Sequence, residues 1–236
     1  MFFPWVGMFE QIRLADVYVH YDDVQFSKGS FTNRVQIKTA TGSQWMTVPL
    51  RNLSLGQRIE DVKIDNRKDW RASHISMLHN AYSGAHWRND MLAIVEKVYR
   101  DEEDSIGELS RRSMAACCEY LGIDFERSFM RIADLKIGGS SSQRVLDVVK
   151  AVGGDCYITG LGARNYLDHE LFEASSVSVE YMSYELRSYP QLHGNFTPYV
   201  SVLDLFANVG RAGANWVLSK SIFWKEFLKN EPHRTI

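Results

Sequence analysis

The sequence predicts an α/β protein with a partly parallel sheet, covering helices and a helical central insertion. Three observations carry this prediction. Strand and helix patterns alternate from residue 125 onward, which is typical of parallel strands joined by helices. The segment from about 66 to 122 has helical spacing throughout, and short alternating runs fill the part before it. We expect a single domain over residues 1–236, with the insertion at about 66–122 and a C-terminal helix at about 214–228.

The N-terminal part reads as a short helix followed by strands. The predicted elements are a helix at 8–15 and strands at 16–21, 34–39, 44–50 and 59–64. The strands at 34–39 and 44–50 flank a Thr-Gly-Ser turn at 41–43, which favours a hairpin.

The remaining elements follow from helical spacing, glycine stops and short apolar runs. The predicted helices are 69–83, 87–100, 105–121, 142–152, 165–174 and 201–209, and the predicted strands are 125–132, 156–159 and 177–182. Asp65 and Asn66 are candidate caps of the first of these helices, and Gly122 is expected to stop the third. The proline-interrupted segment 189–199 is predicted to be a loop.

Composition narrows the class of protein. The chain has 236 residues, 45% apolar and 24% charged, which is ordinary for a globular protein. A net charge of −2 gives no general attraction to nucleic acid or anionic lipid. No apolar run approaches the ~18 residues of a membrane span, and the N-terminus has no basic region of a secretory signal. Three cysteines form neither a disulfide framework nor a CxxC pattern, so we expect a cytoplasmic protein.

Asp22 and Asp23 follow the strand predicted at 16–21, and they are the first candidates for chemistry. Ligands of open α/β sheets bind beyond the carboxyl ends of strands. Neighbouring strand residues point to opposite faces, so we expect one aspartate to meet a ligand and the other to cap the loop. The alternative is that both simply end a strand, as aspartates in turns often do.

A basic, polar loop follows, with Lys28, Arg34 and Lys38. A guanidinium there suits a phosphate or a carboxylate, whereas a solvated basic strand edge that prevents aggregation is the alternative. The stretches GGSSS at 138–142 and TGLG at 159–162 precede predicted helices, but neither is a dinucleotide or P-loop motif. No zinc pattern is present among the histidines near residues 74–86, although a single histidine such as His74 can act as a general base.

Several motifs in order resemble the WbqC-like protein family. They are FFPWVGMFEQI, ADVYVHYDDVQFSKGSFTNRVQIKT, WMTVPL, His74 with Tyr82, YITGLGARNYLD, and YPQLHGNFTPYVSVLDLFANVG, and together they cover roughly residues 2–210. The resemblance implies a role in bacterial O-antigen or other polysaccharide synthesis. It further implies acyl or aminoacyl transfer to the amine of a nucleotide-linked amino sugar. The expected donor is an acyl or aminoacyl thioester, with a carrier protein as one source, and no permanently bound cofactor or metal is expected.

This reaction needs a base for the amine proton and donors for the oxyanion. We expect His74 or Asp22 as the base, Gln25 or Asn33 as orienting or oxyanion groups, and Arg34 at a phosphate or carboxylate. Trp5 and Tyr82 are expected to flank the sugar or the nucleobase. Further substrate-binding candidates, taken from the residues and matched motifs, are Asp23, Tyr166, Asp168, Gln191 and His193. The site is expected between the N-terminal loop and the 189–199 loop. An ATP-dependent amide ligase and a non-catalytic sugar-nucleotide binding protein are the alternatives.

Two further expectations come from family patterns. The WbqC-like pattern begins with a strand and Gln-Pro, so we expect Met1 to be an internal methionine; an intact mass that starts at Met1 would contradict this. The order of strand, Pro-x-x-Gly turn, helix and strand also resembles nucleotidyltransferase-type domains, which favours a Rossmann-like topology.

Overall fold

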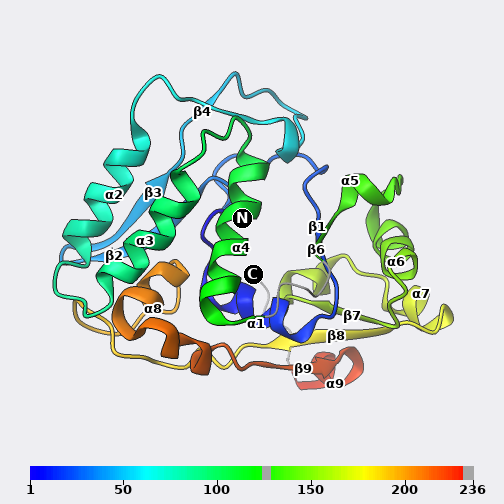
Figure 1. The fold of residues 1–236 in the computed structure, drawn as a ribbon. Helices are drawn as coiled ribbons and strands as arrows, with labels where there is room; N and C mark the ends of the chain where they lie inside the picture. The colour runs from blue at the N-terminus through cyan, green and yellow to red at the C-terminus, as the bar shows by residue number, and fades with distance from the viewer. Residues whose placement is uncertain (124–128, 231–236) are drawn as a thin grey trace. The chain divides into compact units, whose positions relative to one another are not determined.

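The computed structural model describes residues 1–123 and 129–230, and they form two compact units (Figure 1). Unit 1 comprises Met1–Phe9, Tyr21–Phe125 and Leu186–Val217, and unit 2 comprises Glu10–His20, Glu126–Glu185 and Leu218–Ile236. Helix α1 (Val6–Leu14) contributes residues to both units. The single domain expected from the sequence stays a prediction.

The predicted α/β class is confirmed, with small sheets in place of one large sheet. The described strands form three two-stranded sheets and one three-stranded sheet. The pairs β1–β6 and β7–β8 are parallel, and the others are antiparallel. A Rossmann-like topology is not confirmed, because no sheet among the described residues combines more than two parallel strands.

Unit 1 contains the predicted hairpin and the predicted helical segment. Its elements are β2 (Arg34–Thr39), β3 (Gly42–Thr47), β4 (Leu50–Arg51), the 3₁₀ helix η1 (Ile59–Asp61), β5 (Lys63–Ile64), α2 (Trp70–Ala81), α3 (Arg88–Tyr99), α4 (Ile106–Leu121), α8 (Val202–Val209) and the 3₁₀ helix η3 (Gly210–Trp216). Val35 pairs with Met46 in the hairpin, and both face the core. Figure 1 shows α2 and α3 running beside the hairpin. The hairpin turn is one residue earlier than predicted, at residues 40–41.

The ends of the helices in unit 1 follow ordinary capping chemistry. Asp69 caps α2 by accepting a hydrogen bond of 3.0 Å from the Ala72 amide, so the predicted caps Asp65 and Asn66 are wrong. Gly122, at φ 66°, ends α4 as predicted, in a left-handed conformation that suits glycine.

The strand predicted at 59–64 is wrong in its first half. Residues Ile59–Asp61 form η1, and β5 covers only Lys63–Ile64. The Val62 amide donates back to the Ile59 carbonyl at 3.3 Å, which closes a tight turn. The Ile59 amide donates to the Val24 carbonyl at 3.0 Å and the Glu60 amide to the Asp22 carbonyl at 2.9 Å, so pairing with a segment distant in sequence overrides the alternating pattern.

Unit 2 is built around the sheet β7–β8–β9. Its elements are β1 (Tyr18–His20), β6 (Phe129–Arg131), α5 (Ile132–Leu135), α6 (Ser141–Ala151), β7 (Cys156–Thr159), the 3₁₀ helix η2 (Leu161–Asn165), α7 (His169–Ala174), β8 (Ser178–Ser183), β9 (Lys220–Phe223) and α9 (Trp224–Asn230). The core of this unit contains Leu146, Phe172, Val179, Tyr181 and Phe227.

Two predictions for unit 2 are corrected. The helix predicted at 214–228 is instead η3, strand β9 and helix α9, because β9 pairs with β8 and satisfies the backbone of that sheet edge. The helix predicted at 165–174 begins only at His169, since Asp168 accepts from the Leu171 amide at 3.1 Å and caps it there. The strand predicted at 125–132 is confirmed for Phe129–Arg131, whereas Ile132 begins helix α5; residues 124–128 lie outside the described part.

Within residues 1–123 and 129–230, no helix has both the length and the apolar character needed to cross a membrane.

Candidate functional site

The N-terminal turn is fastened at both sides by buried hydrogen bonds in unit 1. The Phe3 amide donates to Ser113 Oγ at 3.0 Å, and Ser201 Oγ donates to the Phe3 carbonyl at 2.8 Å. The Val202 amide donates to the Pro4 carbonyl at 2.9 Å. Phe3 has a φ of 38°, an uncommon left-handed conformation for a bulky residue. These bonds hold the turn between helix α4 and the start of α8.

Trp5 lies over Gly7. A Cβ atom on Gly7 would stand 2.2 Å from the Trp5 ring, so no larger residue fits without displacing the indole. This contact explains the Pro-Trp-x-Gly spacing of the motif. Because one face of the indole covers Gly7, the role of Trp5 beside a sugar or base stays a prediction.

The hairpin brings Arg34, Gln36 and Lys38 to one face of strand β2, because side chains alternate along a strand. Trp45 lies opposite Gln36 in the register, and the Arg34 guanidinium lies 4.1 Å from the centre of the Trp45 ring. The Gln36 carbonyl accepts from the Ser201 amide at 2.8 Å. An isolated bridge then joins Ser201 to Trp5. The hairpin, the N-terminal turn and the start of α8 are therefore continuous in hydrogen bonding.

A closed circuit of hydrogen bonds joins the same strand to the 189–199 loop. Lys38 Nζ donates to Gln191 Oε1 at 2.8 Å, and Gln191 Nε2 donates to the Tyr189 hydroxyl at 3.1 Å. The Tyr189 hydroxyl donates to Asp204 Oδ1 at 2.8 Å, and the Tyr82 hydroxyl donates to Asp204 Oδ2 at 3.0 Å. The Lys38 amide closes the circuit on the Tyr82 hydroxyl at 3.4 Å.

Burial governs the charges in this circuit. Burial raises the pKa of Asp204, while the hydroxyls of Tyr189 and Tyr82 oppose that rise. Burial, and secondarily the Asp204 charge, also raise the pKa of both tyrosines, so the hydroxyls keep their protons and act as donors. Lys38 is 5% exposed, and its ammonium also donates to the Asn195 carbonyl at 2.6 Å. The circuit thus holds the 189–199 loop on strand β2.

Of the predicted substrate residues, Gln191 and Tyr82 are both brought into the circuit. Tyr82 is fully buried, which places its ring in the core and away from any ligand surface. His193 lies on the same loop as Gln191, at φ 64°, and its Nε2 lies 2.6 Å from the Ala81 carbonyl. A carbonyl only accepts, so Nε2 carries the proton and Nδ1 of the neutral ring has a lone pair.

His74 occupies a different environment from the one predicted for a base. Its Nε2 lies 3.0 Å from the Thr47 carbonyl and its Nδ1 lies 2.9 Å from the Tyr99 hydroxyl. Burial lowers the pKa of His74 to about 4, with the Thr47 hydrogen bond opposing. Both ring nitrogens are engaged and the ring is neutral near pH 7, which favours a structural role.

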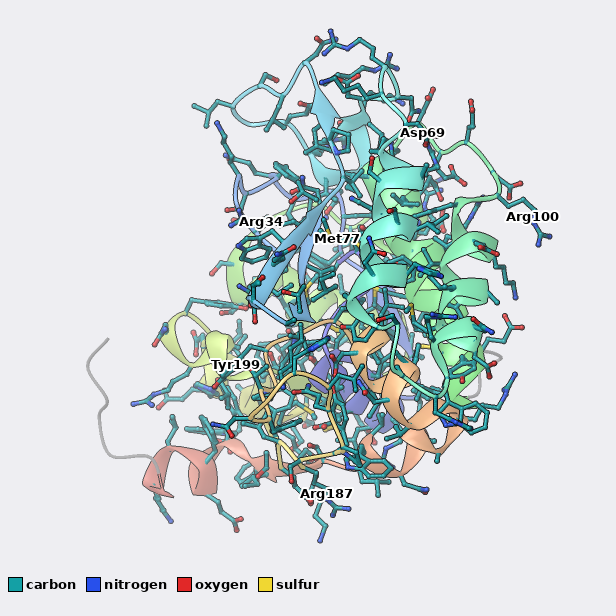
Figure 2. The ribbon with its side chains drawn as sticks, turned by 90° about the vertical axis from the view of Figure 1, so that its left-hand side faces the viewer. Arg34, Asp69, Met77, Arg100, Arg187 and Tyr199 are labelled. Atoms are coloured by element: carbon teal, nitrogen blue, oxygen red, sulfur yellow. The ribbon has the colours of Figure 1, made fainter. Side chains whose placement is uncertain are left out.

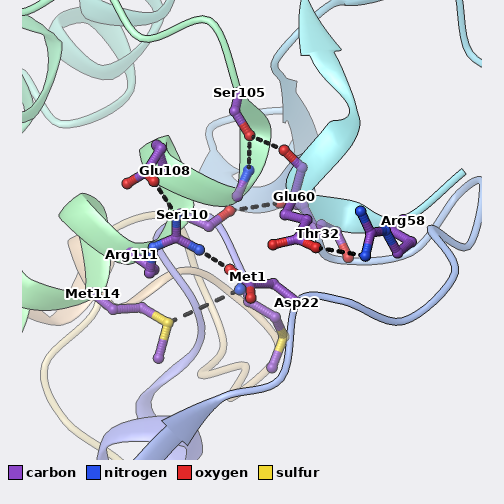
Figure 3. Close-up of polar contacts among 11 residues, drawn as sticks. Met1, Asp22, Thr32, Arg58, Glu60, Ser105, Glu108, Ser110, Arg111 and Met114 are labelled. Atoms are coloured by element: carbon purple, nitrogen blue, oxygen red, sulfur yellow. Dashed lines mark hydrogen bonds and ion pairs between the residues drawn. The ribbon is translucent and has the colours of Figure 1, made fainter. Parts of the chain in front are cut away.

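Asp22 forms an ion pair with Arg111, which also pairs with Glu108 (Figure 3). Asp22 is 6% exposed, and its carbonyl accepts from the Glu60 amide at 2.9 Å. A carboxylate held beside a guanidinium is a poor proton acceptor, because the positive charge stabilises the ionised form. These contacts favour a structural ion pair, and Asp23 next to it is half-buried.

The other predicted residues are separate from the circuit. Asn33 is buried, and its side chain donates to the Val48 carbonyl at 2.9 Å, so it ties the loop to the hairpin. Gln25 is exposed and forms a backbone bridge to Arg58. Tyr166 and Asp168 belong to unit 2, where Tyr166 is exposed and Asp168 caps α7.

Asp204 and Tyr189 are site residues that the sequence predictions lack, and Lys38 appears there only as part of a basic loop. Asp204 is a single carboxylate inside a largely apolar helical run, SVLDLFANV, and such a residue needs buried partners. That was the signal available in the sequence. Over the described ranges, no group of three or more His, Cys, Asp or Glu residues is placed to hold a metal ion.

Fold and site together define an α/β protein with a polar circuit that begins at Lys38 of the β2–β3 hairpin. The chain belongs to the WbqC-like protein family, whose model matches residues 1–215. It is 33% identical over 222 residues to the "uncharacterized protein Rv1507c" of Mycobacterium tuberculosis, covering 92% of this chain and 94% of that protein. No solved structure matches the chain.

Proposed function

We propose that this protein transfers an acyl or aminoacyl group to the amine of a nucleotide-linked amino sugar during O-antigen or other polysaccharide synthesis. The observation that carries the proposal is the hydrogen-bonded circuit through Lys38, Gln191 and Asp204. It joins the family motifs in strand β2, the 189–199 loop and helix α8 within unit 1. Such a network pre-organises the groups around it, which acyl transfer requires.

His193 is the base in this proposal, in place of His74. Its Nε2–H bond to the Ala81 carbonyl orients the ring and leaves the Nδ1 lone pair for a proton. The sugar amine attacks the carbonyl carbon of an acyl thioester, and the amine proton moves to Nδ1. The carbon–sulfur bond then breaks, and the thiolate leaves and takes up that proton as a thiol. The donor is a free thioester or one attached to a carrier protein.

The test is incubation of the protein with nucleotide-linked amino sugars and a panel of acyl and aminoacyl thioesters, followed by mass measurement. A mass gain equal to the acyl group supports transfer. A gain that requires ATP, Mg²⁺ and the free acid identifies a ligase instead. Thermal stabilisation by the sugar nucleotide with no gain from any donor identifies a binding protein and contradicts transfer.

A matched pair of variants tests the base. His193→Asn keeps a residue that tolerates the left-handed backbone, but it has no basic nitrogen. We expect a loss of turnover of about 10²- to 10⁴-fold, with substrate binding kept. The control His79→Asn changes an exposed histidine on α2 and is expected to leave turnover unchanged. Equal turnover of the His193→Asn and control variants would remove His193 from the mechanism.

A further inference from the structure

Two exposed rings and a guanidinium form a shelf on the outer side of the β2–β3 hairpin in unit 1. We call Phe31, Arg34 and Trp45 the ring–guanidinium shelf. The Phe31 and Trp45 rings are 5.7 Å apart and are 55% and 39% exposed. Figure 2 shows Arg34 on the side of the hairpin opposite to helix α2, on which Met77 is labelled.

The charge of Arg34 is not balanced by a carboxylate within the described residues. Its Nη2 donates to the Gly29 carbonyl, and its Nε is buried with no hydrogen-bond partner. By contrast, Arg58, Arg67 and Arg111 each pair with an aspartate. A guanidinium has five donors in a planar fork, and this one has donors left for an anion such as a phosphate.

The shelf also offers exposed aromatic rings for stacking, which Trp5 and Tyr82, the residues expected to flank the sugar or nucleobase, do not. Tyr82 is fully buried and the Trp5 ring covers Gly7. Trp45 is exposed and lies directly opposite Gln36, whose side-chain amide has no hydrogen bond to any described residue. An amide of this kind pairs with the donor and acceptor edge of a nucleobase. Stacking, anion binding and edge recognition therefore come together on one face.

We propose that the ring–guanidinium shelf binds a nucleoside diphosphate. The base stacks on the exposed rings of Phe31 and Trp45, and the phosphates meet the spare donors of Arg34. This inference rests on the proposed function for its choice of a nucleotide-linked substrate. It does not need the transfer step, because a nucleotide binds this shelf whether or not an acyl donor follows.

The test is isothermal titration of the full chain with uridine 5′-diphosphate, guanosine 5′-diphosphate, uridine and inorganic pyrophosphate. Trp45→Leu removes the larger stacking face, and we expect it to weaken binding of the better diphosphate by about 5- to 150-fold. Arg34→Gln is expected to weaken the binding of both the diphosphate and pyrophosphate, and to weaken the binding of uridine less. Arg34→Lys keeps the charge without the planar fork and is expected to recover part of the affinity.

Arg100→Gln is the matched control, because Arg100 is exposed at the end of α3, on the far side of unit 1 from Arg34 in Figure 2. It should bind as the wild type does, and unchanged melting temperatures confirm that each variant is folded. The proposal is overturned if neither diphosphate binds at millimolar concentration, or if both bind no more tightly than pyrophosphate. Wild-type diphosphate affinity in Trp45→Leu would also overturn it. If the diphosphate binds but no acyl group is transferred, the proposed nucleotide site is supported and the proposed transferase function is contradicted. If Trp45→Leu and Arg34→Gln both transfer the acyl group with the wild-type KM for the sugar nucleotide, the transfer reaction is supported and the shelf is excluded as the nucleotide site.

Discussion

The hydroxyl of Tyr82 donates to Oδ2 of Asp204 across 3.0 Å, and both residues are 0% exposed. They are 122 positions apart in the chain, so this bond ties the C-terminal cap of helix α2 to helix α8. A buried carboxylate is stable only when donors surround it, and Asp204 receives two tyrosine hydroxyls and the Asn208 amide. The arrangement makes the circuit a strong determinant of the fold of unit 1.

Asp204→Asn should destabilise unit 1 by about 2–4 kcal/mol, because it places an amide NH₂ against a hydroxyl donor and removes a charged acceptor. Urea unfolding measures this loss. Tyr82→Phe and Tyr189→Phe, each combined with Asp204→Asn, complete two double-mutant cycles. Strict additivity in both cycles would contradict coupling through the circuit.

Stability should fall in acid because of His74. Its pKa is lowered to about 4 in the folded protein from 6.5 when unfolded. Between these pH values the unfolded chain binds more protons, so acid favours unfolding. We expect His74 to contribute a loss of about 3 kcal/mol in the free energy of unfolding between pH 7 and pH 4.

The check is the pH dependence of urea unfolding in two variants. His74→Gln cannot titrate and should have a shallower slope over pH 4–6.5, whereas His79→Gln, on the exposed side of the same helix, should keep the wild-type slope. Parallel slopes for wild type and His74→Gln would show that other groups produce the acid dependence.

Gly7→Ala should destabilise the protein by about 1–3 kcal/mol, because the added Cβ would overlap the Trp5 ring at 2.2 Å. Thermal and urea unfolding measure the change. Gly84→Ala is the control within unit 1, since its nearest neighbour, Leu192, would lie at an ordinary 3.9 Å. Once Trp5 is replaced by alanine, the overlap is gone. Adding Gly7→Ala to Trp5→Ala should therefore lower the free energy of unfolding much less than Gly7→Ala lowers it in the wild type. Without that difference, the two residues are not coupled.

Asp22→Asn should cost about 3–5 kcal/mol in the free energy of unfolding, because it removes the buried carboxylate that pairs with the largely buried Arg111. Asp61→Asn, which breaks an exposed pair with Arg58, should cost less than about 1 kcal/mol. Equal costs for the two variants, combined with loss of turnover only in Asp22→Asn, would restore Asp22 as a candidate base.

Sequence predictions are correct where an element depends on neighbouring residues, and they fail where it depends on residues distant in the chain. The hairpin at 34–39 and the helix stopped by Gly122 depend on local alternation, spacing and capping, and both are confirmed. The helix predicted at 214–228 is wrong because β9 is formed by pairing with β8, a partner about 40 residues away. The loop at 189–199 was predicted from its prolines, but its anchor on Lys38 was not.

The α/β class, the family and the segments that carry the motifs follow from the amino-acid sequence alone, because periodicity, turn residues and motif order are properties of neighbouring positions in the chain. The contacts of the candidate residues within those segments depend on the folded arrangement of the chain. This arrangement placed His74 and Asp22 in structural contacts and gave the 189–199 loop its partners Lys38, Tyr82 and Asp204. Burial and charge pairing depend on residues distant in sequence, and these set whether a side chain anchors the fold or faces a ligand.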